Sequence, residues 1–218
     1  TVYRVTFMSD EVPIFTLGTV LFPQGVLPLR VFEPRYVDMI KECMRGGVPF
    51  GVACIRDGAE VGSAASIYDV GTYARITDFD LLDNGLLGIT ATGEERFRIH
   101  ETAVRPDQLL VATKVSAIAP DATEALPEEF AHLAQIVTEI IAATQRAQPD
   151  NVATDDGDDA QSAAWIANRI AEVLPIPLAR KQHLLELTDP LLRLREVHEV
   201  VVRLSEQEED DDNSEETH

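Results

Sequence analysis

Up to about Ile118, the apolar residues alternate with polar ones in short runs that Gly, Pro and Asp interrupt. Alternation over roughly four to eight residues is typical of strands that bury one face. The expected strands cover residues 12–17, 26–32, 49–55, 70–81, 86–99 and 109–118. About six short strands with a single helix among them predict a small, closed or partly closed β-barrel.

Turn and breaker residues refine this pattern. Pro28 cannot donate a ladder hydrogen bond, so its strand is expected at an edge or a bulge. Asp83-Asn84-Gly85 joins two of the longer runs, and Asn-Gly is a strong hairpin signal. In the second of these runs the apolar side chains share one parity, which predicts that they line one face of a curled sheet: Leu87, Ile89, Ala91, Phe97 and Ile99.

One helix is expected inside the strand region. Pro34 suits a first helical position, and Gly46-Gly47 is a stop signal. Between them the apolar residues recur every three or four positions, at Tyr36, Val37, Ile40, Cys43 and Met44. The sequence therefore predicts a helix that begins at Pro34 and ends at the glycine pair.

From Pro120 the apolar spacing changes to the helical period. The first of four expected helices opens at Pro127-Glu128-Glu129, two more cover 162–174 and 178–187, and the last opens at Asp189-Pro190. Their predicted inward positions are Phe130, Leu133, Val137, Ile140 and Thr144, then Trp165 or Ile166, Ile170 and Val173, then Leu194, Val197, Val201 and Leu204. The prediction is an α+β protein with a barrel subdomain over 10–119, a helical bundle over 120–205 and a disordered acidic tail over 206–218.

The net charge of -20, from 38 acidic against 18 basic residues, changes the choice of partners. Proteins that bind nucleic acid neutralise phosphates with clustered Lys and Arg, and this chain has no basic run. Glu206 to His218 holds eight of the acidic residues. A solubilising surface is favoured for this tail over a site for a basic partner or a metal.

The expected setting is the cytoplasm. No apolar run approaches the roughly 18 residues that a membrane span needs, and Thr1 to Asp10 does not resemble a signal peptide. The two cysteines, Cys43 and Cys54, form no metal-binding pair in sequence. Two reduced core thiols are favoured over a bridge between them.

No catalytic or metal-binding motif is found, so neither enzymatic activity nor a cofactor is expected. The chain lacks a phosphate-binding P-loop and a GxSxG nucleophile elbow. Lys114 and Ser116 share a strand face, which is more typical of a polar surface stripe than of a Ser–Lys protease. The five histidines are scattered, and Asp155–Asp159 lacks the spacing of an EF-hand.

The segment from Phe22 to Tyr36 concentrates prolines, aromatics and arginines. Apolar side chains in proline-stiffened loops make good platforms for extended polypeptide. Two interpretations stay open for the aromatics: they contact a polypeptide, or they close the barrel and seat its helix. The predicted polypeptide-binding residues are Phe22, Pro23, Arg30, Phe32, Glu33, Arg35 and Tyr36.

Several motifs in a fixed order carry a family resemblance. They are VPIFTLGTVLFP at 12–23, LPL at 27–29, FEPRY at 32–36, GTYARI at 71–76, GITATGEERF at 88–97, and the segments LP at 174–175, KQHLLE at 181–186 and LRL at 192–194. Together they resemble the N-terminal, substrate-binding domain of Lon proteases, in particular its short stand-alone bacterial members. The resemblance covers about residues 10–205.

This resemblance implies a PUA-like barrel followed by a helical bundle, and a role in holding or recruiting unfolded polypeptide. It implies extended polypeptide as the partner. A protease or a chaperone is a further expected partner, whereas the charge and the lack of a long apolar run exclude nucleic acid and membrane from the prediction. In full-length Lon enzymes an ATPase module and a Ser–Lys protease module follow, and neither motif is found here. The alternatives are an RNA-binding PUA-like module, which the charge opposes, a peptidase-associated regulator, and an enzyme.

Overall fold

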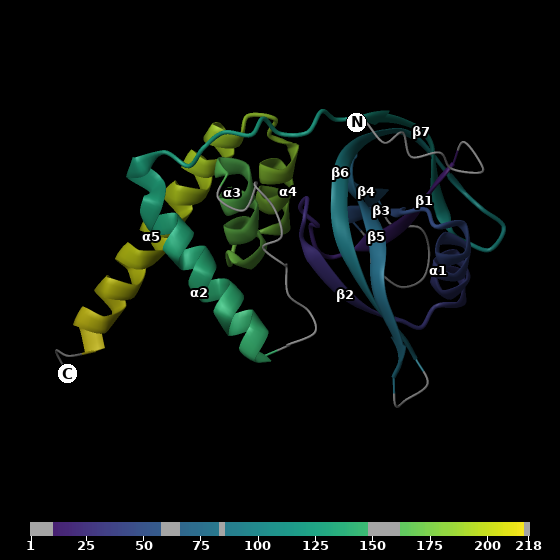
Figure 1. Ribbon diagram of the computed structural model, residues 1–218, viewed down its shortest axis with the longest axis horizontal. Helices are drawn as coiled ribbons and strands as arrows, with labels where there is room; N and C mark the ends of the chain where they lie inside the picture. The colour runs from purple at the N-terminus through teal and green to yellow at the C-terminus, as the bar shows by residue number, and fades with distance from the viewer. Residues whose placement is uncertain (1–10, 58–65, 83–85, 148–161, 216–218) are drawn as a thin grey trace.

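The structure is a computed structural model that describes residues 11–57, 66–82, 86–147 and 162–215. The strands gather in one part of the molecule and four of the helices in the other (Figure 1). The segment after the last strand passes from the strand part to the helical part. The architecture is therefore the predicted α+β arrangement, with the strands first along the chain and most helices after them.

The strand part is a sheet that closes on itself. Its strands are β1 (Val12–Leu17), β2 (Val26–Val31), β3 (Phe50–Asp57), β4 (Ser66–Ile67), β5 (Val70–Leu81), β6 (Leu87–Val104) and β7 (Leu110–Ala117). β1 pairs with β7 and, in parallel, with β3, and the pairs β3–β5, β5–β6 and β6–β7 complete a ring. β2 pairs with β6, and the two-residue β4, which the pattern did not predict, pairs with β3.

The six expected strands are all present, and β2 is an edge strand as Pro28 predicted. Pro28 lies opposite Thr90 of β6, and no second partner strand of β2 occurs in the described part of the chain. The turn expected at 83–85 lies outside the described residues.

β6 does not keep one apolar face along its length, so that prediction was wrong. Between its pairs at Gly93 and Arg96, β6 has one residue more than β5. A single extra residue moves every later side chain to the opposite face. Ile89 therefore lies in the barrel core, whereas Phe97 belongs to a separate cluster on the other side of the sheet.

Helix α1 (Pro34–Gly46) has the predicted bounds. It ends because Gly47 adopts φ 62°, a left-handed conformation that costs glycine little. Its apolar face, with Tyr36, Met39 and Ile40, packs into the barrel core.

The helical part contains a short 3-10 helix η1 (Glu128–Phe130), α2 (Ala131–Ala147), α3 (Ala163–Val173), α4 (Leu178–Glu186) and α5 (Pro190–Glu215). The helix starts agree with the prediction. Two inward assignments were wrong: Val173 is 53% exposed because α3 ends there, and Thr144 is exposed.

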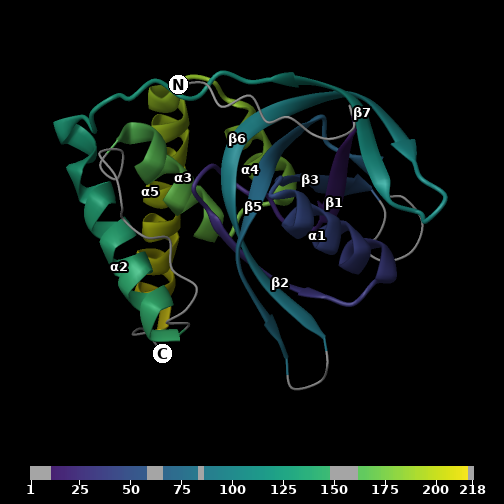
Figure 2. The same ribbon diagram turned by 45° about the vertical axis from the view of Figure 1, so that its right-hand side comes forward.

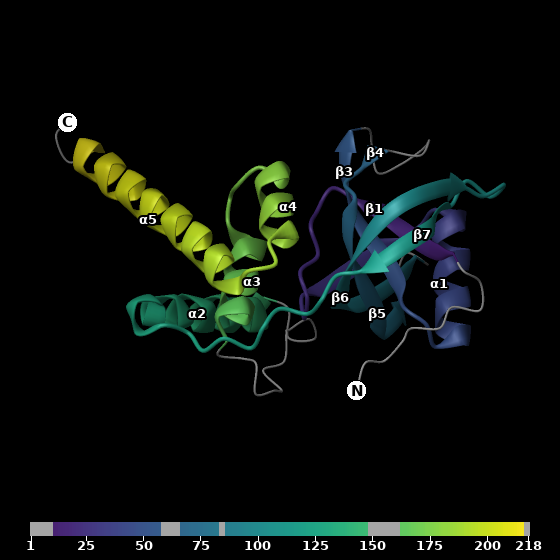
Figure 3. The ribbon, with the colours of Figure 1, turned by 90° about the horizontal axis from the view of Figure 1, so that it is seen from above.

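Helix α5 continues to Glu215, into the segment predicted as an acidic tail. No Gly or Pro interrupts the chain after Pro190, and Glu and Gln favour helices. Leu194 and Val197 anchor the first half of α5 in the core, and the second half projects away from the rest of the molecule (Figure 3).

The two parts share one core. Val20, Phe22, Cys54 and Val70 of the strand part pack in the same cluster as the buried side chains of α2, α3, α4 and α5. The boundary at about residue 120 is therefore a change of secondary structure with a packed interface across it.

Candidate functional site

The structure places part of the predicted binding segment inside the molecule. Phe22 is fully buried against the helical part. Tyr36 stacks on Phe15 with ring centroids 4.0 Å apart, and its hydroxyl lies 3.0 Å from Thr16 Oγ1. The second interpretation of these two aromatics therefore holds: Phe22 seats the bundle, and Tyr36 seats α1.

Arg35 is also buried and paired within the fold. Its guanidinium pairs with Glu33 at 2.9 Å, donates to the carbonyl of Gln108 at 3.0 Å and lies over the Tyr36 ring. Its side chain is 8% exposed, and it links α1 to the loop between β6 and β7. Glu33 is half-buried as its partner.

The other predicted residues remain accessible. Arg30 is exposed on β2, Phe32 is 57% exposed in the turn before α1, and Pro23 is half-buried. Of the seven predicted residues, Pro23 alone lines the groove between the two parts of the molecule. The structure thus does not gather the segment into one continuous surface.

A groove of about 890 Å³ runs between the barrel and the bundle. Six separated stretches line it: Pro23 and Gln24, then Gly46 to Pro49, then Arg75, then Gly93 to Arg96, then Pro120 to Thr123, then Ser162, Ala164, Trp165 and Asn168 of α3 and its cap. Concave sites with mixed apolar and polar lining are the usual form of a binding site.

Two ion pairs lie within the lining of the groove, Arg75 with Glu94 and Arg96 with Asp121. Arg75 forms a two-pronged contact with Glu94, at 2.5 and 3.3 Å. Asn168 differs: it is 4% exposed, and its Oδ1 has no hydrogen-bond partner among the described residues. An unpaired buried acceptor costs about 1–3 kcal/mol, so Asn168 is an under-satisfied polar residue in the wall of the groove.

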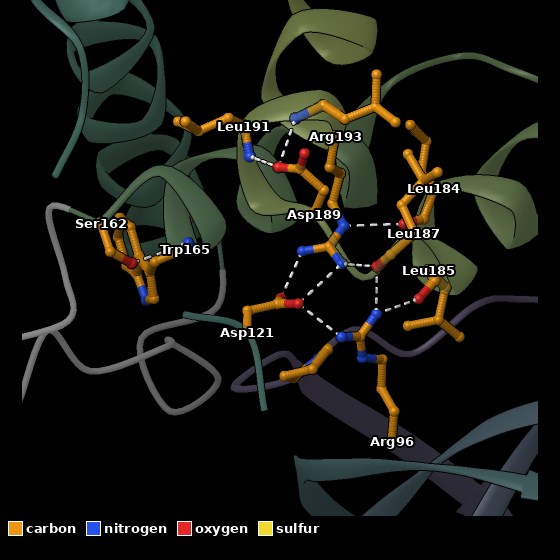
Figure 4. Close-up of polar contacts among 12 residues, drawn as sticks. Arg96, Asp121, Ser162, Trp165, Leu184, Leu185, Leu187, Asp189, Leu191 and Arg193 are labelled. Carbon is orange, nitrogen blue, oxygen red and sulfur yellow. Dashed lines mark hydrogen bonds and ion pairs between the residues drawn. The ribbon is translucent and has the colours of Figure 1, made fainter. Parts of the chain in front are cut away.

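One side of the groove is held by a buried arginine pair around a single carboxylate (Figure 4). Asp121 accepts from Arg96 at 2.6 Å and from Arg193 at 2.6 Å. Arg96 also donates to the carbonyls of Leu185 and Leu187. Burial lowers the pKa of Arg96, and Asp121 opposes that effect. A strand residue, a linker residue and a helix residue are thus fixed together at the groove.

Sequence patterns could not single out these residues, because the groove assembles them from six stretches of chain. One local signal existed. Asn168 and Arg169 are consecutive polar residues in a helix whose other positions from Ala163 to Ala171 are apolar. Both are buried, and Arg169 donates to the carbonyls of Pro23 and Gln24.

The two residues considered for a Ser–Lys protease lie on the surface, as the pattern predicted for a polar stripe. Lys114 and Ser116 are both exposed; Lys114 pairs with Glu101 at 3.3 Å, and Ser116 Oγ lies 2.8 Å from His100 Nε2. Among the described residues, no group of three or more His, Cys, Asp or Glu could hold a metal ion. The run Asp155–Asp159 lies outside them.

Both cysteines are buried, and burial raises the pKa of Cys43 to about 11. None of the described helices combines the length and the apolar character needed to cross a bilayer.

Comparison with known proteins places this architecture in a family. Residues 11–203 match the ATP-dependent protease La (LON) substrate-binding domain, and the chain belongs to that family. No protease or ATPase domain is indicated within it.

Similar proteins include Lon protease 2 of Myxococcus xanthus, 29% identical over 207 residues, which cover 91% of this chain and 24% of that protein. The Lon protease of Anaeromyxobacter dehalogenans is 28% identical over 89% of this chain and 23% of its own length. The chain thus spans about a quarter of the curated relatives that it matches.

Two solved structures resemble the fold. The Lon N-terminal domain protein from Xanthomonas campestris has a TM-score of 0.68 and 33% identity, and the match covers 86% of this chain and 96% of that one. The N-terminal domain of a Mycobacterium avium complex Lon protease has a TM-score of 0.56 at 20% identity, over 87% and 97% of the two chains.

Proposed function

We propose that the protein is a non-catalytic module that binds extended polypeptide in the groove between barrel and bundle. The observation that carries the proposal is Asn168, whose buried oxygen lacks a donor in a groove that Trp165 and three prolines line. Backbone N–H groups are the donors that every extended polypeptide offers. Membership of a family of substrate-binding domains supports the same class of ligand.

The proposal includes the cytoplasm as the setting and a protease or a chaperone as the partner that receives bound polypeptide. Arg30 and Phe32, exposed near one end of the barrel, are proposed to contribute further contacts outside the groove. RNA is not part of the proposal, because a charge of -20 repels a phosphate backbone.

Trp165 offers a direct test, because it is the one tryptophan of the chain and it lines the groove. Reduced and alkylated ribonuclease A is unfolded and free of tryptophan, so it can be titrated against the intrinsic fluorescence. We expect a saturable change in Trp165 emission. Ala164→Gln, which places a longer side chain in the groove, is expected to weaken binding at least tenfold.

The matched control is Ala143→Gln, on an exposed position of α2 outside the groove. It should bind like the unchanged protein, and circular dichroism should show that both variants keep their helix content. Binding without a change in Trp165 emission, or equal affinity for both variants, would refute the groove as the site.

A further inference from the structure

The hairpin of β5 and β6 extends beyond the end of the barrel (Figures 1 and 2). β5 pairs with β3 only through Thr72, Tyr73 and Ala74. From Arg75 to Leu81, β5 has pairs with β6 on one side and with no described strand on the other. This stretch, the free edge of β5, starts at a residue that also lines the groove.

The free edge has one apolar face and one acidic face. Phe79 lies opposite Ile89 and Leu81 opposite Leu87, and directly opposed side chains share a face. Ile89 belongs to the barrel core, so Phe79 and Leu81 continue that apolar face beyond the barrel. They are 59% and 71% exposed.

The other face owes its charge to a slip in register. Between the pairs at Ile76 and Asp78, β5 gains one residue relative to β6. Because such a slip exchanges the faces, Asp78 and Asp80 come to lie side by side on the face away from the core. Both are exposed.

The outward backbone groups of this edge are held by side chains of the strand itself. The N–H of Phe79 donates to Asp78 Oδ1 at 2.8 Å, and the N–H of Leu81 donates to Asp80 Oδ1 at 2.7 Å. The N–H of Leu82 instead bonds to Leu86 across the hairpin. Amides alternate in direction along a strand, so those of Phe79 and Leu81 face the free edge.

We infer that the free edge of β5 accepts one added strand from a polypeptide whose side chains alternate between apolar and basic residues. The inference rests on the proposed polypeptide binding and adds the class of segment and the mode of contact. Strand addition lets main-chain bonds supply affinity while alternate side chains supply selectivity. Apolar residues of the added strand pack beside Phe79 and Leu81, and basic ones face Asp78 and Asp80.

The carboxylates give the basic preference a physical reason. An incoming strand takes over the N–H groups of Phe79 and Leu81, which leaves Asp78 and Asp80 without those donors. Lysine or arginine on the same face of the added strand restores a charged donor to each carboxylate. A strand with acidic residues at those positions would meet like charges instead and is excluded.

The test measures, by calorimetry, the binding of three capped eight-residue peptides to the full chain. The first repeats Val-Lys, the second repeats Val-Glu, and the third is the Val-Lys peptide with N-methyl groups on one edge of its backbone. We expect the Val-Lys peptide to bind at least tenfold more tightly than either of the others. Hydrogen exchange at the amides of Phe79 and Leu81 should slow at least tenfold in its presence.

Phe79→Ser with Leu81→Ser should weaken binding of the Val-Lys peptide at least tenfold, because both side chains are exposed and their loss leaves the fold intact. Val202→Ser, at an exposed apolar position of α5, is the matched control and should bind normally. The doubly substituted hairpin should still give the Trp165 response to unfolded ribonuclease A at the groove.

Three outcomes would overturn the inference: equal binding of the N-methylated peptide, unchanged exchange at the two amides, or full affinity in the Phe79 and Leu81 variant. Self-association of the chain through this edge, abolished by the same variant, would also overturn it in favour of a second copy. None of these would remove the groove response, so failure here is distinct from failure of the proposed function.

Discussion

At the residue scale, buried polar side chains connect the barrel to the bundle. Arg169 reaches from α3 to the carbonyls of Pro23 and Gln24, and it also pairs with Glu172 at 2.6 Å. Lys181 donates to the backbone carbonyl of Glu172 from α4. Burial raises the pKa of Glu172 to about 7, although Arg169 and Lys181 both act to lower it.

This shift makes the stability depend on pH. The pKa of glutamate in an unfolded chain is about 4.3. Between about pH 4.3 and 7, the unfolded chain has therefore released a proton that the folded chain still holds. The contribution of Glu172 is fully present below that window and is lost as pH rises through about 7. Relative to the unchanged protein, Glu172→Gln should gain melting temperature from pH 5 to about 7 and level off above that pH.

The control is Glu139→Gln, which makes the same chemical change on the exposed face of α2, away from the interface. A flat difference for Glu172→Gln over the same range, measured by thermal melting followed by circular dichroism, would disprove the pH assignment.

At the element scale, the ends of helices and the bulges of strands decide which side chains meet. Pro34 and Gly47 bound α1, and Ser162 begins α3 by accepting from the N–H of Trp165 at 3.2 Å. The two register slips between β5 and β6 lie in different strands. The extra residue in β6 sends Phe97 to a second cluster, and the extra residue in β5 puts Phe79 on the same face as Ile89.

Helix α5 offers a prediction at this scale. Asp189 caps it, because its Oδ1 accepts from the N–H groups of Leu191 and Leu192 at 2.9 and 3.1 Å. Asp189→Ala should lower the free energy of unfolding by about 1 kcal/mol, since it removes the acceptor for two free helix donors. Asp189→Ser, which keeps an acceptor, should recover most of that loss in urea denaturation; equal losses would argue against capping.

At the scale of the whole molecule, the shared core and the arginine network make the barrel and the bundle one structure. Arg96 and Arg193 have side chains 2% and 1% exposed, and Asp121 between them is 10% exposed. These three residues come from β6, the linker and α5. The groove therefore lies between walls that are fixed to each other.

Asp121→Ala leaves two buried guanidinium groups side by side without a counter-charge. We expect a loss of about 3–5 kcal/mol in the free energy of unfolding, the usual cost of breaking a buried pair. Glu101→Ala, which breaks the exposed pair with Lys114, should cost about 0–1 kcal/mol. Chemical denaturation of both variants checks this, and similar small losses would show that the network does not hold the interface.

The sequence predicted the elements well, but of the seven residues predicted to bind polypeptide only Pro23 lines the groove. Alternation, glycine stops and proline starts are local properties, so strands such as 70–81 and helices such as 34–46 emerged with nearly correct ends. The aromatics of 22–36 could not be divided into core and surface from the pattern alone. Phe22 and Phe32 belong to the same residue type, yet one is fully buried and the other 57% exposed.

What the sequence determined by itself was the order and type of elements, the acidic charge and, through the motifs spread over 10–205, the family. These depend on neighbours along the chain. What only the tertiary structure decided was which faces meet: the bulges that separate Ile89 from Phe97, the groove around Asn168 and the free edge of β5. Side-chain direction depends on register and on distant partners, and a one-residue slip reverses it without leaving a mark in the local pattern.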